Sequence, residues 1–365
     1  MLATTPTPSH DSLRRSTCRS RCRGRGSWSR STTGPDRAVA KERSPPRPRR
    51  VADVIEALEP FRVELTGYCY RMLGSGFEAE DAVQETLVRA WKAFDSYDSA
   101  RASLRTWLYR IATNICIDMR RSAQRRALAV DLGPAGGQLG APLLENAFVQ
   151  PVPDSVVLPE DQAIRRETVR LAFVAALQHL PARQRAVLIL RDVLAWQASE
   201  VAALLSVSVA SANSALQRAR ATLRVVDAGT PLDVSDPVQK SLLRRYCEAF
   251  ERHDVRTLVA LLHEDATMSM PPFSWWLRGR GPISLALSDP NAACAGAWLV
   301  PVSANASPAF WQMRPGLDRP FGLVFLDVRG GLVTGTTTYL NVEELLPLFG
   351  SPMSSGRPLR ISSDD

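Results

Sequence analysis

Polar side chains near the middle of the chain have the spacing needed to bind the base edges of duplex DNA. The apolar pattern of Ala198–Arg220 is typical of a helix-turn-helix, with Val201, Ala202 and Leu205 facing inward from a first helix and Leu216 beneath a second. The second helix would be capped by Ser208 and would expose Ser211, Asn213, Ser214, Gln217, Arg218 and Arg220. Such side chains bond base edges and phosphates in the major groove. An ordinary helical hairpin in a bundle would show the same apolar pattern.

A polar face of another kind occurs earlier, on a helix expected over Glu78–Phe94. Asp81, Gln84 and Glu85 lie together on it, apart from an apolar stripe made of Val83, Leu87, Ala90, Trp91 and Phe94. An acidic face of this kind is commonly only solvated. It could also bind a partner protein.

A third helix, expected over Ser103 to about Arg121, combines an apolar stripe with a basic face. The stripe contains Leu104, Trp107, Leu108, Ile111 and Ile115, so we interpret Trp107 as a packing residue. Melted DNA is held in positively charged grooves. Candidate contacts on or beyond this helix are Arg105, Arg110, Asn114, Asp118, Arg120, Arg121, Arg125 and Arg126. A solvated basic face is the alternative.

Three motifs in a fixed order carry a family resemblance. They are the D-x-x-Q-E helix in Phe77–Trp91, the segment Leu104–Asp118, and Leu180-Pro-Ala-Arg-Gln-Arg-Ala-Val-Leu188. Together with the helix-turn-helix they resemble the extracytoplasmic-function (ECF) sigma factors of the sigma-70 family over residues about 55 to 225. The resemblance implies a sigma region 2 domain followed by a region 4 domain.

The resemblance also implies partners and roles. The core RNA polymerase would be bound through its flap and through the clamp helices of its largest subunit, the latter by Asp81, Gln84 and Glu85. The helix after Ser103 would contact the −10 promoter element and capture a base flipped out of the melted strand. The helix-turn-helix would contact the −35 element. No anti-sigma factor is identified by the sequence.

Beyond the connector Val225–Pro237 the pattern changes from helical to alternating. Helices over Val238–Phe250 and Val255–Leu262 precede five strand-like runs, which predicts a separate α+β domain. Arg245–Pro272, Ala304–Phe310 and the strands of Phe321–Tyr339 are similar to SnoaL-like polyketide cyclases, which are related to ketosteroid isomerases. The resemblance implies a cone with an apolar pocket, whose candidate lining residues are Met268, Met270, Phe273, Trp275, Trp276 and Phe310. Residues of these types more often simply fill a core.

Catalysis by this domain is not supported by the sequence. A general acid or base would have to lie inside the cone, whereas the acidic and histidine candidates fall at expected helix ends: His253, Asp254, His263, Glu264 and Asp265. Sigma factors that resemble this chain use such an extension for self-regulation, by packing it on regions 2 and 4 or on the linker between them.

Composition limits the remaining possibilities. The net charge of +8 comes from residues 1–50, which hold thirteen Lys or Arg and three acids, so the other 315 residues carry −2. The basic balance is therefore no evidence that the folded part binds nucleic acid. Six scattered cysteines and four histidines indicate neither a disulfide framework nor a metal site, and no cofactor is indicated. With no apolar run long enough to span a bilayer, we expect a soluble cytoplasmic protein.

These observations predict a multidomain protein with two all-α domains and a C-terminal α+β SnoaL-like cone. The expected boundaries are a disordered basic tail over 1–50, region 2 over 51–126, a linker over 127–160, region 4 over 161–225, a linker over 226–237, the SnoaL-like domain over 238–350 and a tail over 351–365. The basic tail could be a nucleic-acid arm, a transit peptide or sequence before a misassigned start codon. Competing functions are a stand-alone helix-turn-helix regulator and an isomerase or cyclase with a helical targeting module.

Overall fold

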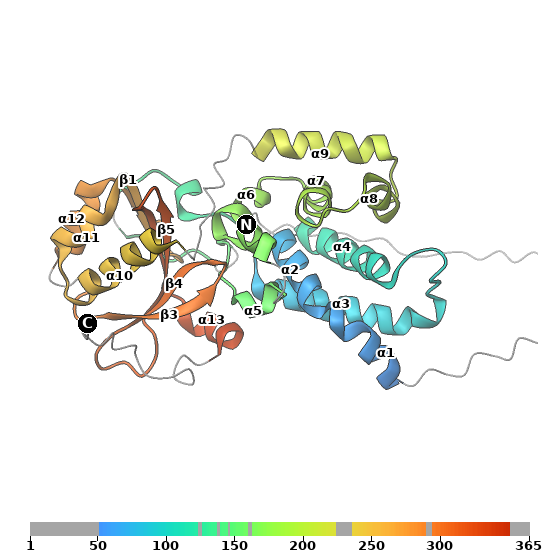
Figure 1. The fold of residues 1–365 in the computed structure, drawn as a ribbon, viewed down its shortest axis with the longest axis horizontal. Coiled ribbons are helices and arrows are strands. Elements are labelled where there is room, and N and C mark those ends of the chain that lie inside the picture. The colour runs from blue at the N-terminus through green and yellow to red at the C-terminus, as the bar shows by residue number, and fades with distance from the viewer. Residues whose placement is uncertain are drawn as a thin grey trace, which may run out of the picture. The chain divides into compact units, whose positions relative to one another are not determined.

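A six-stranded mixed sheet at the C-terminal end of the chain packs beside two groups of helices in the computed structural model (Figure 1). The structure describes residues 51–122, 126–136, 139–144, 147–159, 163–223, 236–289 and 294–350, without the side chains of Val51, Arg121, Ser122 and residues 163–165. The tails expected over 1–50 and 351–365, and most of the linker expected over 226–237, lie outside the described residues. Residues 49–365 form one compact unit.

The first helical group contains the helices predicted to carry the acidic and basic faces. Its members are α1 (Val51–Leu58), the 3-10 turn η1 (Glu59–Phe61), α2 (Arg62–Leu73), α3 (Gly76–Ala93), the 3-10 turn η2 (Phe94–Ser96) and α4 (Leu104–Ser122). Gly74, at φ 76°, ends α2 in the left-handed conformation that glycine adopts without steric cost. Ser75 then caps α3 by accepting a bond from the Glu78 amide at 3.2 Å.

The segment that follows is packed against the helices, although its Gly and Pro content predicted a long extended linker. It contains the 3-10 turn η3 (Ala129–Asp131) and the short helix α5 (Asp154–Val157), and it buries Phe148, Val149 and Val152. At Gly67 the backbone of α2 approaches α5 so closely that a Cβ would lie 2.3 Å from the Val157 carbonyl oxygen. Buried contacts therefore hold this segment in place.

The second helical group contains the helix-turn-helix. Its members are the 3-10 helix η5 (Ala163–Val169), α6 (Leu171–Gln178), α7 (Ala182–Leu188), the π-turn η6 (Ile189–Val193), α8 (Ala198–Leu205) and α9 (Val209–Leu223). The chain is extended at Arg170 (ψ 143°), and this break separates η5 from α6. The break leaves the Val169 carbonyl oxygen free of the helix, and it accepts a bond from Asn305 at 2.6 Å.

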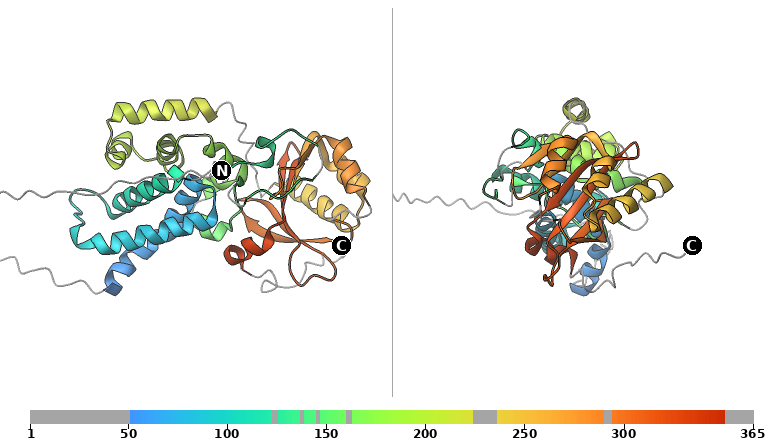
Figure 2. Two further views of the ribbon diagram at one scale, coloured as in Figure 1. Left: turned by 180° about the vertical axis from the view of Figure 1, so that it is seen from behind. Right: turned by 90° about the vertical axis from the view of Figure 1, so that its left-hand side faces the viewer.

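The C-terminal domain places three helices on one face of the sheet. Figures 1 and 2 show α10 (Pro237–Glu251), α11 (Val255–Leu261) and α12 (Arg280–Leu287) on the face away from the helical groups, with α13 (Val342–Phe349) on the opposite side. The strand order is β2-β1-β6-β5-β4-β3, in which only β1 and β6 are parallel. The strands are β1 (Leu262–Ser269), β2 (Trp276–Arg278), β3 (Trp298–Ala304), β4 (Ser307–Met313), β5 (Gly322–Arg329) and β6 (Leu332–Tyr339).

Both faces of the sheet are buried, each in a different core. On β5, Val324 and Leu326 point into the cluster covered by α10, α11 and α12. The alternate residues Leu323 and Phe325 join a cluster that continues through the linker and both helical groups. Strands β3 to β6 therefore attach the domain to the helices through one face of the sheet.

No single helix among the described residues has both the length and the apolar character needed to cross a bilayer. The pair α8 and α9 meets that test only when the two are taken together, and they meet at an angle of 100°.

Candidate nucleic-acid interface

The second helix of the helix-turn-helix presents its predicted polar face to solvent. Ala212, Leu216 and Ala219 of α9 are buried. The predicted contact residues between them are exposed: Ser211, Asn213, Ser214, Gln217, Arg218 and Arg220. Ser208 accepts a bond from the Ser211 amide at 3.1 Å, which is the predicted cap. Arg220 differs from the rest, because its guanidinium binds Asp192 through two bonds of 2.8 and 2.7 Å.

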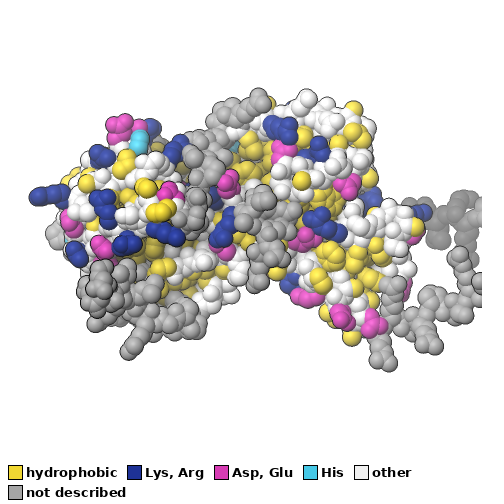
Figure 3. Space-filling view, in the orientation of Figure 1, with side chains coloured by type: hydrophobic (Ala, Val, Ile, Leu, Met, Phe, Trp, Pro, Cys, Tyr) yellow, Lys and Arg dark blue, Asp and Glu magenta, His cyan; other side chains and the backbone are white. Residues whose placement is uncertain are grey.

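The acidic face of α3 is also exposed. Asp81, Gln84 and Glu85 all lie at the surface, and Glu85 pairs with Arg89 at 2.6 Å on the same helix. Acidic side chains gather over α3 and α1 in the space-filling view (Figure 3). The placement of Trp91 in the buried stripe was wrong: the stripe runs through Ala79, Ala82, Val83, Thr86 and Ala90, and Trp91 is 44% exposed. Asp81, Gln84, Val88 and Trp91 are spaced three or four residues apart, so they lie along one side of the helix. Trp91 therefore extends the exposed face.

Helix α4 is covered by the second helical group along part of its basic face. Arg105 donates to the Glu64 carboxylate at 3.0 Å, and its guanidinium carbon lies 5.1 Å from the centre of the Tyr109 ring and 5.3 Å from that of Trp196. Arg110 donates to the Ser206 hydroxyl at 2.8 Å, at the end of α8. Two of the predicted DNA contacts are thus engaged within the protein.

The other predicted residues of α4 have different environments. Asn114 and Asp118 are exposed, Arg120 is partly buried, and the side chain of Arg121 and all of Arg125 lie outside the described residues. Arg126 is buried and pairs with Glu78 at 2.5 Å, so its assignment as a DNA contact is corrected. Trp107 packs on Tyr97 with ring centres 5.1 Å apart, which confirms its interpretation as a packing residue.

A single asparagine of the C-terminal domain joins three parts of the chain. Asn305, at the turn between β3 and β4, is fully buried; its amide donates to the Tyr70 phenol oxygen at 2.7 Å and to the Val169 carbonyl at 2.6 Å. Its side-chain oxygen accepts a bond from the Val152 amide at 2.8 Å. Burial raises the pKa of Tyr70, which keeps its hydroxyl protonated to donate to the Gln150 carbonyl at 2.8 Å.

Two carboxylates strengthen the same contact region. Asp154 accepts a bond from the Ala306 amide at 2.7 Å, and burial raises its pKa although that bond and Arg166 oppose the shift. Asp327 pairs with Arg170 at 3.4 Å. Half of the Asp327 side chain is exposed, yet the surrounding protein still desolvates it and raises its pKa against the effect of Arg170.

The expected pocket residues lie in different surroundings. Phe310 is buried in the helix-covered core, Met268 and Trp275 pack at its edge, and Met270 and Phe273 are partly buried. Trp276 points elsewhere: it packs on Phe148 of the linker and donates to the Gly133 carbonyl at 2.8 Å.

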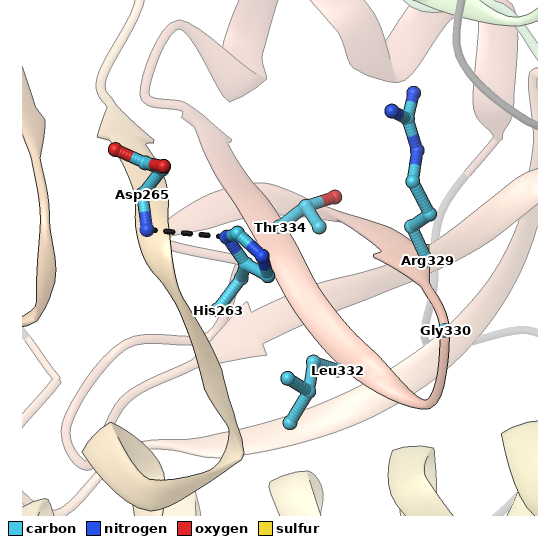
Figure 4. Close-up of a pocket in the computed structure, with 6 residues that line it drawn as sticks. All are labelled: His263, Asp265, Arg329, Gly330, Leu332 and Thr334. Atoms are coloured by element: carbon cyan, nitrogen blue, oxygen red, sulfur yellow. Dashed lines mark hydrogen bonds between the residues drawn. The ribbon is translucent and has the colours of Figure 1, made fainter.

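A pocket of about 570 Å³ lies instead at the turn between β5 and β6 (Figure 4). Its lining shares no residue with the expected set: His263, Asp265, Arg329, Gly330, Leu332 and Thr334. Among the described residues, no group of three or more acidic, His or Cys side chains could hold a metal ion.

Sequence reasoning missed Trp196, Tyr70 and Asn305 as contact residues. Trp196 comes shortly after the π-turn η6 and directly after Ala195, which has a positive φ of 57°. π-Bulges are frequent at functional positions, but the sequence does not reveal them. Asn305 and Ala306 both have positive φ, as a tight two-residue hairpin requires, and an Asn between two strand-like runs was the available signal.

Comparisons with known proteins agree with this arrangement. The family model Sigma-70 region 2 matches residues 58–126, and Sigma-70, region 4 matches residues 170–223. The ECF RNA polymerase sigma factor SigG of Mycobacterium tuberculosis is 42% identical over 322 residues, which cover 85% of this chain and 86% of that protein. SigJ of the same organism is 31% identical over 218 residues, 59% of this chain and 64% of SigJ.

A solved structure shares the fold. The crystal structure of M. tuberculosis SigJ aligns with a TM-score of 0.54 at 23% identity and covers 82% of this chain and 99% of that one.

Two helical domains that match the sigma-70 models, one of them with an exposed helix-turn-helix, define a promoter-binding subunit of RNA polymerase; a C-terminal domain built on a mixed sheet is joined to them. The chain belongs to the ECF sigma factors of the sigma-70 family. Its partners are accordingly the RNA polymerase core and promoter DNA.

Proposed function

We propose that the exposed face of α3 docks on the clamp helices of the polymerase's largest subunit, with Asp81, Gln84 and Glu85 as the contacts. The observation that carries this assignment is the exposure of all three side chains on one helix whose opposite face is buried. Trp91, exposed on the same side, adds an apolar contact of the kind found in the centre of protein interfaces. The polymerase flap would contact the second helical group.

Promoter DNA would be bound by two helices. The exposed face of α9 reads the −35 element through Ser211, Asn213, Ser214, Gln217 and Arg218, while Arg220 is held by Asp192 and contributes less. Helix α4 contacts the −10 element, with Asn114 and Asp118 exposed for this role. Arg105 and Arg110 contact the second helical group, so both would be more accessible to DNA if that group moved away.

The C-terminal domain would regulate the helical domains and not catalyse a reaction. Its turn between β3 and β4 contacts α2, the linker and the last residue of η5 through Asn305, so it stabilises one arrangement of regions 2 and 4. Its helix-covered side is filled by apolar residues that pack against one another. Regulation would then be an equilibrium between packed and released states.

Run-off transcription with core polymerase tests the assignment of α3. Gln84→Ala combined with Glu85→Ala should lower both the retention of the protein by immobilised core polymerase and the yield of transcript, by roughly tenfold if about 1.4 kcal/mol of contact is lost. Glu56→Ala, an exposed acid on α1, is the matched control. Unchanged retention of the double variant would remove α3 from the polymerase interface.

Regulation by the C-terminal domain is tested best in the full chain. The core is continuous across the sheet and both helical groups, so a chain ending near Arg224 would expose apolar surface and confuse loss of regulation with misfolding. Asn305→Ala should instead shift the equilibrium towards the released state and alter transcript yield at limiting protein. If yields match the wild type on every promoter tested while the contact is weakened, the regulatory role is wrong.

A further inference from the structure

Trp196 of the second helical group covers a surface on α4 that has the chemistry of a base-binding site. Its ring centre lies 5.1 Å from that of Tyr109, and the Arg105 guanidinium is within 5.3 Å of both rings. Unstacked bases bind to proteins by stacking on aromatic rings and on the planar guanidinium of arginine. The indole therefore occupies the place, and makes the contacts, that an extruded base would take.

The packing of Trp196 on Tyr109 and Arg105 is not an optimised core contact. Trp196 is only 5% exposed, yet its indole N–H has no acceptor among the described residues. Buried tryptophans usually have a partner for this group, and leaving it without one costs free energy. Arg110 of α4 also donates a hydrogen bond to Ser206 of the second helical group. This bond lies at the surface, where water can replace it.

We propose that Trp196 is an internal plug of the strand-capture surface on α4, so that the closed protein and the protein bound to single-stranded promoter DNA exclude each other. This inference rests on the proposed −10 role of α4. In the closed state, Trp196 stacks on Tyr109 and Arg105 and the bases of the melted strand have no access to them. Separation of α8 from α4 uncovers both side chains together, since Arg110 is released from Ser206 in the same movement.

Binding of single-stranded DNA to the full chain tests the plug. The probe is a fluorescein-labelled pool of random-sequence DNA decamers, measured by anisotropy at fixed salt without polymerase. Trp196→Ala should bind about five- to tenfold more tightly than the wild type, because a larger fraction of the protein is open. Trp196→Phe keeps a ring on Tyr109 and should stay within about twofold of the wild type. Leu285→Ala, at a 78% exposed position on α12, is the control.

A second readout does not depend on the alanine variant being folded. Subtracting the emission of Trp196→Phe from that of the wild type isolates Trp196, which should be shielded from acrylamide in the free protein and quenched once saturating decamer is present. A merely structural Trp196 would stay shielded. Wild-type affinity in Trp196→Ala together with an unchanged quenching constant overturns the plug.

Failure of the plug and failure of the underlying site give different results. Adding Arg105→Ala to Trp196→Ala should weaken decamer binding severalfold if α4 captures the strand. If Arg105→Ala has no effect in that background, the −10 assignment of α4 itself is wrong. If Arg105→Ala weakens binding but Trp196→Ala equals the wild type, strand capture by α4 stands and only the plug is rejected.

Discussion

The side-chain amide of Asn305 donates to the phenol oxygen of Tyr70 at 2.7 Å, across 235 positions of sequence. This bond joins the turn between β3 and β4 to helix α2. Because Asn305 also bonds Val152 and Val169, one side chain fixes the linker and the start of α6 against the same point. We therefore treat it as the central polar contact between the C-terminal domain and the rest of the chain.

Replacing Asn305 should destabilise the whole protein. Asn305→Ala leaves the Val169 carbonyl and the Val152 amide buried without partners, which should cost about 2–4 kcal/mol of the free energy of unfolding. Chemical denaturation monitored by circular dichroism measures the change. Ser303→Ala, at an exposed position of the same hairpin, should change it by less than about 0.5 kcal/mol. Equal stability of the two variants would show that the Asn305 bonds contribute nothing net.

Adding one methyl group at Gly67 should push the linker away from α2. The new Cβ would lie 2.3 Å from the Val157 backbone oxygen, and a backbone atom cannot rotate aside as a side chain can. Alanine favours the helix by about 1 kcal/mol over glycine, but the clash should outweigh this and destabilise by about 1–3 kcal/mol. Thermal unfolding and protease cleavage near Val157 report the effect.

Gly281→Ala is the matched control for Gly67→Ala. Gly281 lies in α12 with no atom within 4 Å of the position of a Cβ, so alanine there should be neutral or stabilising. A stabilised Gly67→Ala protein would mean that α5 does not pack on α2 in solution.

The two arginines of α9 should differ in their contribution to DNA binding. Arg218 is exposed, whereas Arg220 is held by two bonds to Asp192. Arg218→Ala should weaken binding of promoter duplex by holoenzyme and reduce the slope of log affinity against log salt by about 1, as expected for one lost phosphate contact. Arg220→Ala should reduce that slope by clearly less. Equal slopes for both variants would contradict the assignment.

Stability should depend on the protonation of Asp154. Burial raises its pKa above the ordinary value of 3.8, so the folded protein holds this proton more tightly than the unfolded chain. The resulting stabilisation is fully present below pH 3.8 and is lost as the pH rises through the raised pKa. The free energy of unfolding of the wild type should therefore fall relative to that of Asp154→Asn over this interval, measured by urea titration at several pH values.

Asp154→Asn keeps an oxygen that can accept the bond from the Ala306 amide, so the comparison isolates the charge. If the curve of Asp154→Asn remains parallel to that of the wild type, Asp154 does not titrate in that interval.

Local patterns predicted the elements that carry the surfaces. The bounds of α8 and α9 follow from the apolar period and from the Ser208 cap, and the strands β3 to β6 follow from alternation that places successive residues in two cores. An α+β domain was predicted from five strand-like runs, and β2 was not among them. The sequence also identified the polar residues of α3 and α9 that the structure places at the surface.

The remaining features depend on contacts between distant segments. The break at Arg170 coincides with the bond from Asn305 to the Val169 carbonyl, and no helix propensity near Arg170 predicts it. Trp276 packs on Phe148, so a residue expected inside the cone instead contacts the linker. Trp91 lies one position beyond Ala90, the last buried residue of the apolar stripe. On a helix, one position can decide whether a side chain is buried or exposed.

One buried apolar cluster extends from α2 through Val149 and Val152 to Leu323 and Phe325 of the sheet. A boundary drawn along the sequence therefore does not coincide with a boundary in the hydrophobic core. Losing any one part uncovers apolar surface on the others, and calorimetry should record a single cooperative heat-absorption peak for residues 51–350 where three independent domains would give three.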